Sequence, residues 1–263
     1  MSKTDQTTSM RYDYDLENPD YKNWIVTESK FDPKFLGKCE AIFALGNGYM
    51  GQRAATEERY TKEVRNLFVA GTFNKFAENE VTELPNAADV LWMDIHLNGE
   101  TFNLKDGKIH EYKRYLNLKD AQLVRRIKWE APTGEIFKLS FLRFISLADR
   151  HVIVNRIVIT PLSGSANIAL TSGINGQMTN GGAQHFIEGE RRLFDKTYMQ
   201  LIQTTAESGI DFVLNSTHKF KLAGTTIPAP DALIEMERRQ IFMNYHPTKV
   251  AKDEEFIITK FST

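Results

Sequence analysis

The sequence predicts an all-β protein, either a sandwich or a large barrel, that forms one domain. Two observations lead to this prediction. From about residue 88 onward, short segments with strand-like patterns follow one another, separated by turn residues. Helical periodicity is confined to Thr56 to Arg65 and Asp231 to Glu237, so only a few short helices are expected. Residues 1–20 are polar and are expected to be a disordered or loosely docked lead-in, followed by a single β-sandwich domain over residues 21–263.

Alternation of apolar and polar residues marks the first long strands. Met93 to Leu97 alternates in this way, and Asn98-Gly99 supplies a hairpin turn into the next strand. The stretch from Glu135 to Arg143 alternates as well, with Phe and Leu at every second position. Both stretches have the period-2 pattern of a strand with one face buried.

A β-branched run predicts a strand that is buried on both faces. His151 to Thr160 is rich in Val and Ile, and Pro161 closes it. Such a composition is typical of a central strand. Further strand-like runs follow at Tyr198 to Ile202, Phe212 to Leu214, Leu233 to Met243 and Phe256 to Phe261.

Charge and cysteine content narrow the functional class. The chain of 263 residues has 33 Lys and Arg against 34 Asp and Glu, so binding to nucleic acid or to a membrane surface is not expected. The single cysteine, Cys39, excludes an intrachain disulfide. The sequence shows neither an apolar stretch long enough for a transmembrane helix nor a signal peptide, and the expected location is cytoplasmic.

The most conspicuous motif is a glycine loop from Leu45 to Arg53. Gly46, Gly48 and Gly51 satisfy the G-x-G-x-x-G pattern of dinucleotide-binding proteins, but the sequence that follows lacks the crossover helices of that fold. Two interpretations remain. The glycines form a tight structural loop with positive φ angles or a close backbone approach. Alternatively, the loop presents three side chains to a ligand or an adjoining surface, namely Asn47, Tyr49 and Arg53.

A second candidate is the Gly- and Asn-rich stretch from Gly173 to Glu190, which is expected to be one long loop. Loops of this length in a compact β domain are usually either functional or disordered. Amide and imidazole side chains suit hydrogen bonding to sugar hydroxyls, because they can both donate and accept. The candidates for contact with a sugar or an adjoining domain are Gln177, Asn180 and His185. The alternative is a mobile surface loop without a function.

Other residues give weaker signals. The six histidines are scattered without metal-ligand spacing, so no metal site is predicted. Glu57-Glu58, like the other adjacent carboxylates, is interpreted as solvated loop charge. No residue is assigned a catalytic role. The tryptophans are interpreted either as core residues or as platforms for a sugar ring; they are Trp24, Trp92 and Trp129.

Seven segments, in order along the chain, carry a resemblance to a known family. The segment from Glu40 to Arg53, which contains the glycine loop, is the most specific. The others are Phe68 to Phe73, Glu83 to Asn86, Asn98 to Glu100, Tyr115 to Leu118, Phe144 to Leu147 and Asp149 to His151. Together they resemble the N-terminal domain of glycoside hydrolase family 65, the family of maltose, kojibiose and trehalose phosphorylases. The chain departs from the family pattern at Ala54, where Gly is usual, and between Leu116 and Ala121.

The resemblance implies a large antiparallel super-sandwich like that of galactose mutarotase. It also implies that chemistry resides in a following (α/α)6 barrel, where a Glu protonates the glycosidic oxygen while inorganic phosphate, the co-substrate, attacks with inversion. That barrel is absent from these 263 residues. The expectation is therefore a non-catalytic domain without a cofactor. It would pack on its own catalytic barrel and shape the pocket of a parent enzyme for α-linked glucosides such as maltose.

Three alternatives stay open. The chain is a stand-alone carbohydrate-binding module with Trp92 or Trp129 as an exposed platform, or the parent enzyme is a hydrolase. In the third alternative, the chain is itself an enzyme of the mutarotase type that transfers protons through His and Glu. A homodimer is a further expectation, because a lone sandwich would expose the apolar face that meets the barrel.

Overall fold

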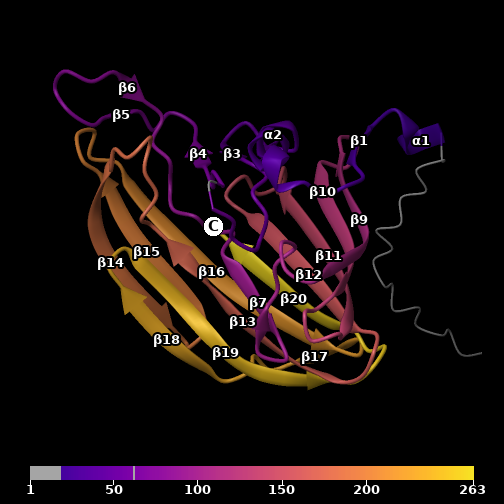
Figure 1. Ribbon diagram of the computed structural model, residues 1–263. Coiled ribbons are helices and arrows are strands. Elements are labelled where there is room, and N and C mark those ends of the chain that lie inside the picture. The colour runs from indigo at the N-terminus through magenta and orange to yellow at the C-terminus, as the bar shows by residue number, and fades with distance from the viewer. Residues whose placement is uncertain (1–18, 62) are drawn as a thin grey trace, which may run out of the picture.

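The computed structural model describes residues 19–61 and 63–263, whose long strands form two facing sheets (Figure 1). Each strand pairs with its neighbours in the antiparallel direction within this part of the chain. The predicted all-β antiparallel sandwich is confirmed. The expected lead-in, residues 1–20, lies almost wholly outside the described residues.

The larger sheet has ten strands among the described residues, in the order β1-β9-β10-β11-β12-β20-β16-β15-β14, with β17 paired to β16. Its strands are β1 (Ile25–Glu28), β9 (Lys108–Asn117), β10 (Gln122–Glu130), β11 (Ile136–Ile145), β12 (Ile153–Pro161), β14 (Phe186–Phe194), β15 (Tyr198–Thr205), β16 (Asp211–Leu222), β17 (Thr225–Ile227) and β20 (Phe256–Ser262). The β-branched run from His151 to Thr160 contains most of β12, which lies between β11 and β20 as a central strand, as predicted.

The smaller sheet has the strand order β18-β19-β13-β7-β8. Its strands are β7 (Met93–Leu97), β8 (Glu100–Thr101), β13 (Ala166–Asn175), β18 (Ala232–Glu237) and β19 (Gln240–Val250). The hairpin predicted at Asn98-Gly99 joins β7 to β8, and both turn residues have positive φ, 53° and 89°. Positive φ at both positions is what a two-residue hairpin turn of the Asn-Gly type requires.

The remaining elements gather at one end of the sandwich, the upper end in Figure 1. A three-stranded sheet has the order β2-β3-β4, and β5 pairs with β6. These strands are β2 (Leu45–Gly46), β3 (Met50–Gln52), β4 (Leu67–Val69), β5 (Asn74–Lys75) and β6 (Thr82–Glu83). The helices of the described residues are α1 (Pro19–Lys22), the 3-10 helix η1 (Pro33–Phe35) and α2 (Leu36–Ile42).

The core lies between the two sheets, where inward side chains of both meet. Phe137, Leu139 and Phe141 of β11 are all buried, which confirms the alternation seen in the sequence. Trp129 is fully buried, and its ring meets the edge of Phe102 with 5.2 Å between centroids. One continuous cluster of buried apolar residues extends from α2 to β20.

Three local expectations were wrong. The described residues between Thr56 and Arg65 form loop and turn rather than a helix, because their charged side chains are drawn into the core, as described below. Asp231 to Glu237 contains strand β18 instead of a helix. The loop expected from Gly173 to Glu190 is shorter at both ends, since β13 extends to Asn175 and β14 begins at Phe186. Gly173 is a strand residue because β19 approaches it closely: a Cβ there would lie 2.3 Å from the carbonyl oxygen of Ile241.

Candidate functional site

The glycine loop is the hairpin between β2 and β3. Gly48 has a φ of +84°, and a Cβ on Gly46 would lie 3.2 Å from the carbonyl oxygen of Met50. Gly51 pairs with Gly46 across the hairpin and has open space around it. A dinucleotide site requires the third glycine to open a helix. Here the third glycine, Gly51, lies in strand β3 instead.

Asn47 holds the hairpin in shape and attaches it to a second loop. Its Oδ1 accepts hydrogen bonds from the backbone N–H of Tyr49 and of Met50, at 3.0 and 2.8 Å. Its Nδ2 donates to the carbonyl oxygens of Ser146 and Arg150, at 2.7 and 3.0 Å, in the loop between β11 and β12. Both polar atoms of this amide are therefore occupied within the chain.

Tyr49 and Arg53 flank Asn47 but face different neighbours. The Tyr49 ring meets His151 edge-on, with 4.8 Å between centroids. Arg53 Nη2 donates to the carbonyl oxygen of Gly37 at 3.1 Å and lies 3.4 Å from Glu40 Oε2, so it connects β3 to α2.

Gln177, Asn180 and His185 lie in the segment between β13 and β14. Asn180 Oδ1 accepts from the backbone N–H of Asn86 at 2.7 Å, and its Nδ2 donates to the carbonyl oxygen of Leu84 at 2.9 Å. Gln177 Nε2 donates to the carbonyl oxygen of Arg238 at 2.9 Å. This segment is thus hydrogen-bonded both to an earlier part of the chain, at Leu84 and Asn86, and to a later part, at Arg238.

His185 is buried, with both ring nitrogens engaged. Asn74 Nδ2 donates to His185 Nδ1 at 2.9 Å, since Asn74 Oδ1 already accepts from the backbone N–H groups of Glu207 and Ser208. The ring proton is therefore on Nε2, which donates to Glu83 Oε1 at 2.9 Å. His185 consequently fixes the β5–β6 hairpin to the larger sheet, and it offers no free nitrogen to a ligand.

The six candidates do not converge on one site. Gln177 and Asn180 line a surface groove of about 680 Å³, together with residues from the segments 63–68 and 83–86. Tyr49 lines a different groove, of about 170 Å³, between β3–β4 and the larger sheet.

The structure also shows a buried charged network that the sequence analysis missed. Arg114, Arg125 and Arg143 extend from the adjacent strands β9, β10 and β11, and each side chain is 3% exposed. Arg114 and Arg125 are directly opposite each other in the pairing of β9 with β10. Three neighbouring guanidinium groups in a core require buried partners of opposite charge.

Glu57 and Glu58 are the partners of Arg125 and Arg143, so their interpretation as solvated charges was wrong. Arg114 pairs instead with Glu28, with 2.7 Å between Nε and Oε2. Glu58 binds Arg125 through both carboxylate oxygens. Glu57 bridges two arginines, with 2.9 Å to Arg125 Nη2 and 2.6 Å to Arg143 Nη2. Burial raises the pKa of Glu57, but Arg143 and Arg125 outweigh that effect and lower it to about 2, so the carboxylate stays ionised.

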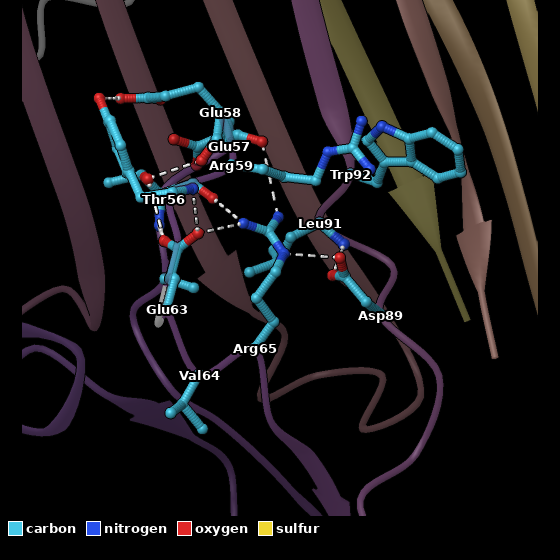
Figure 2. A network of polar contacts seen from close by, with 12 residues as sticks. Thr56, Glu57, Glu58, Arg59, Glu63, Val64, Arg65, Asp89, Leu91 and Trp92 are labelled. Atoms are coloured by element: carbon cyan, nitrogen blue, oxygen red, sulfur yellow. Dashed lines mark hydrogen bonds and ion pairs between the residues drawn. The ribbon is translucent and has the colours of Figure 1, made fainter. Parts of the chain in front are cut away.

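A second part of the network fixes the loop that leads to β4 (Figure 2). Arg65 Nε donates to Asp89 Oδ2 at 2.7 Å, and Arg65 Nη1 donates to Glu63 Oε2 at 2.9 Å. Arg65 Nη1 also reaches the carbonyl oxygen of Thr56 at 2.7 Å. These contacts explain why this segment is a loop: its charged side chains bond to several parts of the core, which a helix would not permit.

The network does not have the form of an active site. The cavity beside Glu57 and the three arginines measures about 10 Å³, room for about one water molecule and too little for a sugar ring. The sequence contains one indication of this buried network, the concentration of charged residues between Thr56 and Arg65.

The tryptophan platform proposed from the sequence is wrong for two of its three members. Trp92 and Trp129 are 5% and 0% exposed, and Arg59 lies over the Trp92 ring. Trp24 is half-exposed. Within residues 19–61 and 63–263, no group of three or more His, Cys, Asp or Glu side chains is placed to hold a metal ion. In the same part of the chain, no helix is long and apolar enough to cross a membrane.

Comparison with known proteins supplies the context for these features. The chain is 47% identical over 230 residues to a kojibiose phosphorylase of Halothermothrix orenii, a match that covers 88% of this chain and 29% of that protein. It is 34% identical over 191 residues to the kojibiose phosphorylase of Escherichia coli, covering 72% of this chain and 25% of the other. An alpha,alpha-trehalose phosphorylase of Thermoanaerobacter brockii is 30% identical over 174 residues, 61% of this chain and 22% of its own length.

A solved structure described as a putative kojibiose phosphorylase from the human microbiome shares the fold, with a TM-score of 0.78 at 18% identity. The alignment covers 92% of this chain and 32% of that one. The chain thus spans between 22% and 32% of the length of these proteins. The family model described as "Glycosyl hydrolase family 65, N-terminal domain" matches residues 26–263, and the chain belongs to this family.

Proposed function

We propose that this chain is the non-catalytic N-terminal domain of a longer glycoside phosphorylase, and that it packs on a catalytic domain that follows it. The observation that carries this proposal is the match to a kojibiose phosphorylase, 47% identical over 88% of this chain but only 29% of the relative. Inorganic phosphate is then the co-substrate of the whole enzyme, as the word phosphorylase implies.

The substrate class follows from the names of the relatives. They are kojibiose and trehalose phosphorylases, whose substrates are disaccharides of α-linked glucose. We therefore propose an α-glucosyl disaccharide, with kojibiose as the first compound to test. Maltose, the example chosen from the sequence, is named in none of these three relatives and ranks below kojibiose and trehalose.

The use of polar side chains supports a scaffold role over a separate carbohydrate-binding module. Asn47, Asn180 and His185 use both of their polar side-chain atoms in bonds within the chain. Sugar binding needs free donors and acceptors beside an open aromatic face. Because Trp92 and Trp129 are buried, the two platforms named for such a module are inaccessible.

Exposed apolar side chains at the upper end of the sandwich support contact with another domain. Val81, in the β5–β6 hairpin, is 76% exposed, and Leu147, in the loop held by Asn47, is 69% exposed. Further exposed apolar residues of α2 and the β4–β6 region are Ile42, Phe73 and Phe76. Apolar side chains that share one end of a domain can form an interaction surface.

The test is phosphorolysis by the full-length protein. Incubated with kojibiose and inorganic phosphate, it is expected to release glucose and a glucose 1-phosphate of inverted, β configuration, observable through the anomeric proton signals in NMR. The chain of 263 residues alone is expected to release neither product. Hydrolysis without phosphate incorporation would show that the parent enzyme is a hydrolase, and turnover by the 263-residue chain would overturn the non-catalytic assignment.

A further inference from the structure

An apolar groove of about 170 Å³ lies between the three-stranded sheet and the larger sheet. Met50 and Val69 line it from β3 and β4, while Phe212 and Leu214 line it from β16. Thr263, which follows β20, lines the same groove. A cavity of about 150 Å³ in a protein core accommodates a molecule of benzene, so this groove has room for one aromatic or branched aliphatic side chain.

The position of Thr263 in the groove wall is fixed. Its backbone exchanges two hydrogen bonds with Asn215 of β16, at 2.9 and 3.0 Å. A third bond of 3.1 Å joins Asn215 Nδ2 to Thr263 Oγ1. The pairing of β20 with β16 therefore extends to Thr263, and a chain that continues from this residue starts beside the groove.

Two polar groups of the groove wall are bonded within the chain, and most of the wall is apolar, which favours an apolar occupant over a sugar. Thr72 Oγ1 donates to the carbonyl oxygen of Val69 at 2.7 Å, and Asp211 Oδ1 accepts from Thr204 Oγ1 at 2.6 Å. The His151 ring packs against Tyr49. A mostly apolar wall favours an apolar side chain.

The following inference rests on the proposed function, because it requires the chain to continue as it does in the relatives. We propose that the groove is a socket for an apolar side chain from the segment that follows Thr263 in the full-length protein. An extended chain advances about 3.3 Å per residue, so the first few residues of that segment can reach the groove. Since the segment is tethered at the groove, its local concentration is high, and a single buried side chain is enough to hold it there. The contact would fix the direction in which the next domain leaves the sandwich.

Cysteine accessibility in the full-length protein tests the socket. Val69→Cys on β4 places a thiol on the face that it shares with its strand partner Met50, toward the groove. Leu193→Cys on β14 is the control, because Val69 and Leu193 are both half-buried and packed against the core, and Leu193 lies outside the groove. The native Cys39 adds little background, because burial, with Glu28, raises its pKa to about 11. Each labelling rate of the native protein is divided by the rate of the same variant in denaturant. This normalised rate of maleimide labelling is expected to be at least about tenfold lower for Val69→Cys than for Leu193→Cys. Equal labelling of the two native variants would overturn the inference.

A photo-crosslink identifies the occupant. With p-benzoylphenylalanine at His151, an exposed residue of the groove wall, irradiation is expected to join this position to a peptide from the segment directly after Thr263. A crosslink to a distant part of the catalytic domain, or to a second copy of the chain, would overturn the inference. Phosphorolysis measured on the same preparations separates the two proposals. Active enzyme with an open groove contradicts the socket alone, whereas a protected groove in a protein without phosphorolysis contradicts the proposed function alone.

Discussion

Arg125 holds both carboxylate oxygens of Glu58 in the core of the sandwich, with Nη1 bound to Oε1 and Nη2 bound to Oε2. Arg125 belongs to β10 of the larger sheet, whereas Glu58 belongs to the loop between β3 and β4. The pair therefore attaches the loop-rich upper end of the molecule to its main sheet. Both side chains are 3% exposed, so water does little to weaken the interaction.

Glu58→Gln is expected to destabilise the chain strongly. Without Glu58, Arg125 keeps only Glu57, which it shares with Arg143, so one buried positive charge is left in excess. Breaking a buried ion pair in this way costs roughly 3–5 kcal/mol. Glu190→Gln is the matched control, because the Glu190–Arg192 pair is 62% and 48% exposed. Exposed pairs contribute about 0–1 kcal/mol. Urea unfolding of the wild type and of the two variants measures the loss of stability. Similar midpoints for Glu58→Gln and Glu190→Gln would contradict the structural role of Glu58.

Acid sensitivity is expected to depend on Glu57. Its pKa in the folded chain is about 2, below its ordinary value of 4.5. Between these two values the unfolded chain binds a proton that the folded chain does not, so the free energy of unfolding falls as the pH falls through this window. Above about pH 4.5 the contribution of Glu57 is fully present.

Glu57→Gln should therefore be less stable at neutral pH and should show a flatter pH dependence between pH 4.5 and 2. Thermal unfolding across this range measures the slope. Glu111→Gln is the control, since the Glu111 side chain is 75% exposed. A Glu57→Gln variant that keeps the wild-type slope would show that other groups control acid unfolding.

The sequence predicted the strands better than it predicted the site, and the reason is physical. Strand patterns such as Phe137-Leu139-Phe141 follow from the local rule that alternate residues face the core, and β11 obeys it. The role of Glu57 depends on Arg125 and Arg143, which are 68 and 86 residues away in the sequence. Local composition carries no information about such partners, so a buried charge and a solvated charge look alike in a sequence.

The same limit applies to the candidate side chains. His185 was selected as a sugar ligand for its chemistry, but Asn74 and Glu83, more than 100 residues earlier, occupy both of its nitrogens. The glycine loop was easier to interpret, because Gly48 needs its positive φ whatever lies around it. Backbone requirements are local, whereas the availability of a polar side chain depends on the whole fold.

Lys260 is expected to make stability rise with pH on the alkaline side. Its Nζ donates to the carbonyl oxygens of Gly173 and Trp92, at 2.7 and 3.1 Å, and the residue is fully buried. Burial lowers its pKa from 10.5 to about 7. Between these values the unfolded chain carries a proton that the folded chain has lost, so the free energy of unfolding increases as the pH rises from about 7 to 10.5.

Lys260→Met removes the titrating group while keeping a side chain of similar length. The variant is expected to lose the rise in stability over this alkaline range, and Lys221→Met, at an exposed position of β16, is expected to retain it. The urea concentrations at the unfolding midpoints of the wild type and both variants, measured from pH 7 to pH 10, test this prediction. Parallel curves for wild type and Lys260→Met would contradict the depressed pKa.

Asn47→Asp separates the two functions of the glycine-loop amide. The substitution keeps the oxygen that accepts from Tyr49 and Met50, but it replaces the donor to Ser146 and Arg150 with a second acceptor facing two carbonyl oxygens. Loss of these bonds, with a polar group left unpaired, is expected to destabilise the chain by about 1–3 kcal/mol. Asn79→Asp, at an exposed position between β5 and β6, is the control and should change stability little. Chemical unfolding measures both variants. If Asn47→Asp is as stable as the control, the bonds to the loop after β11 do not hold the hairpin in place, and the upper end of the sandwich must be organised by the buried charges alone.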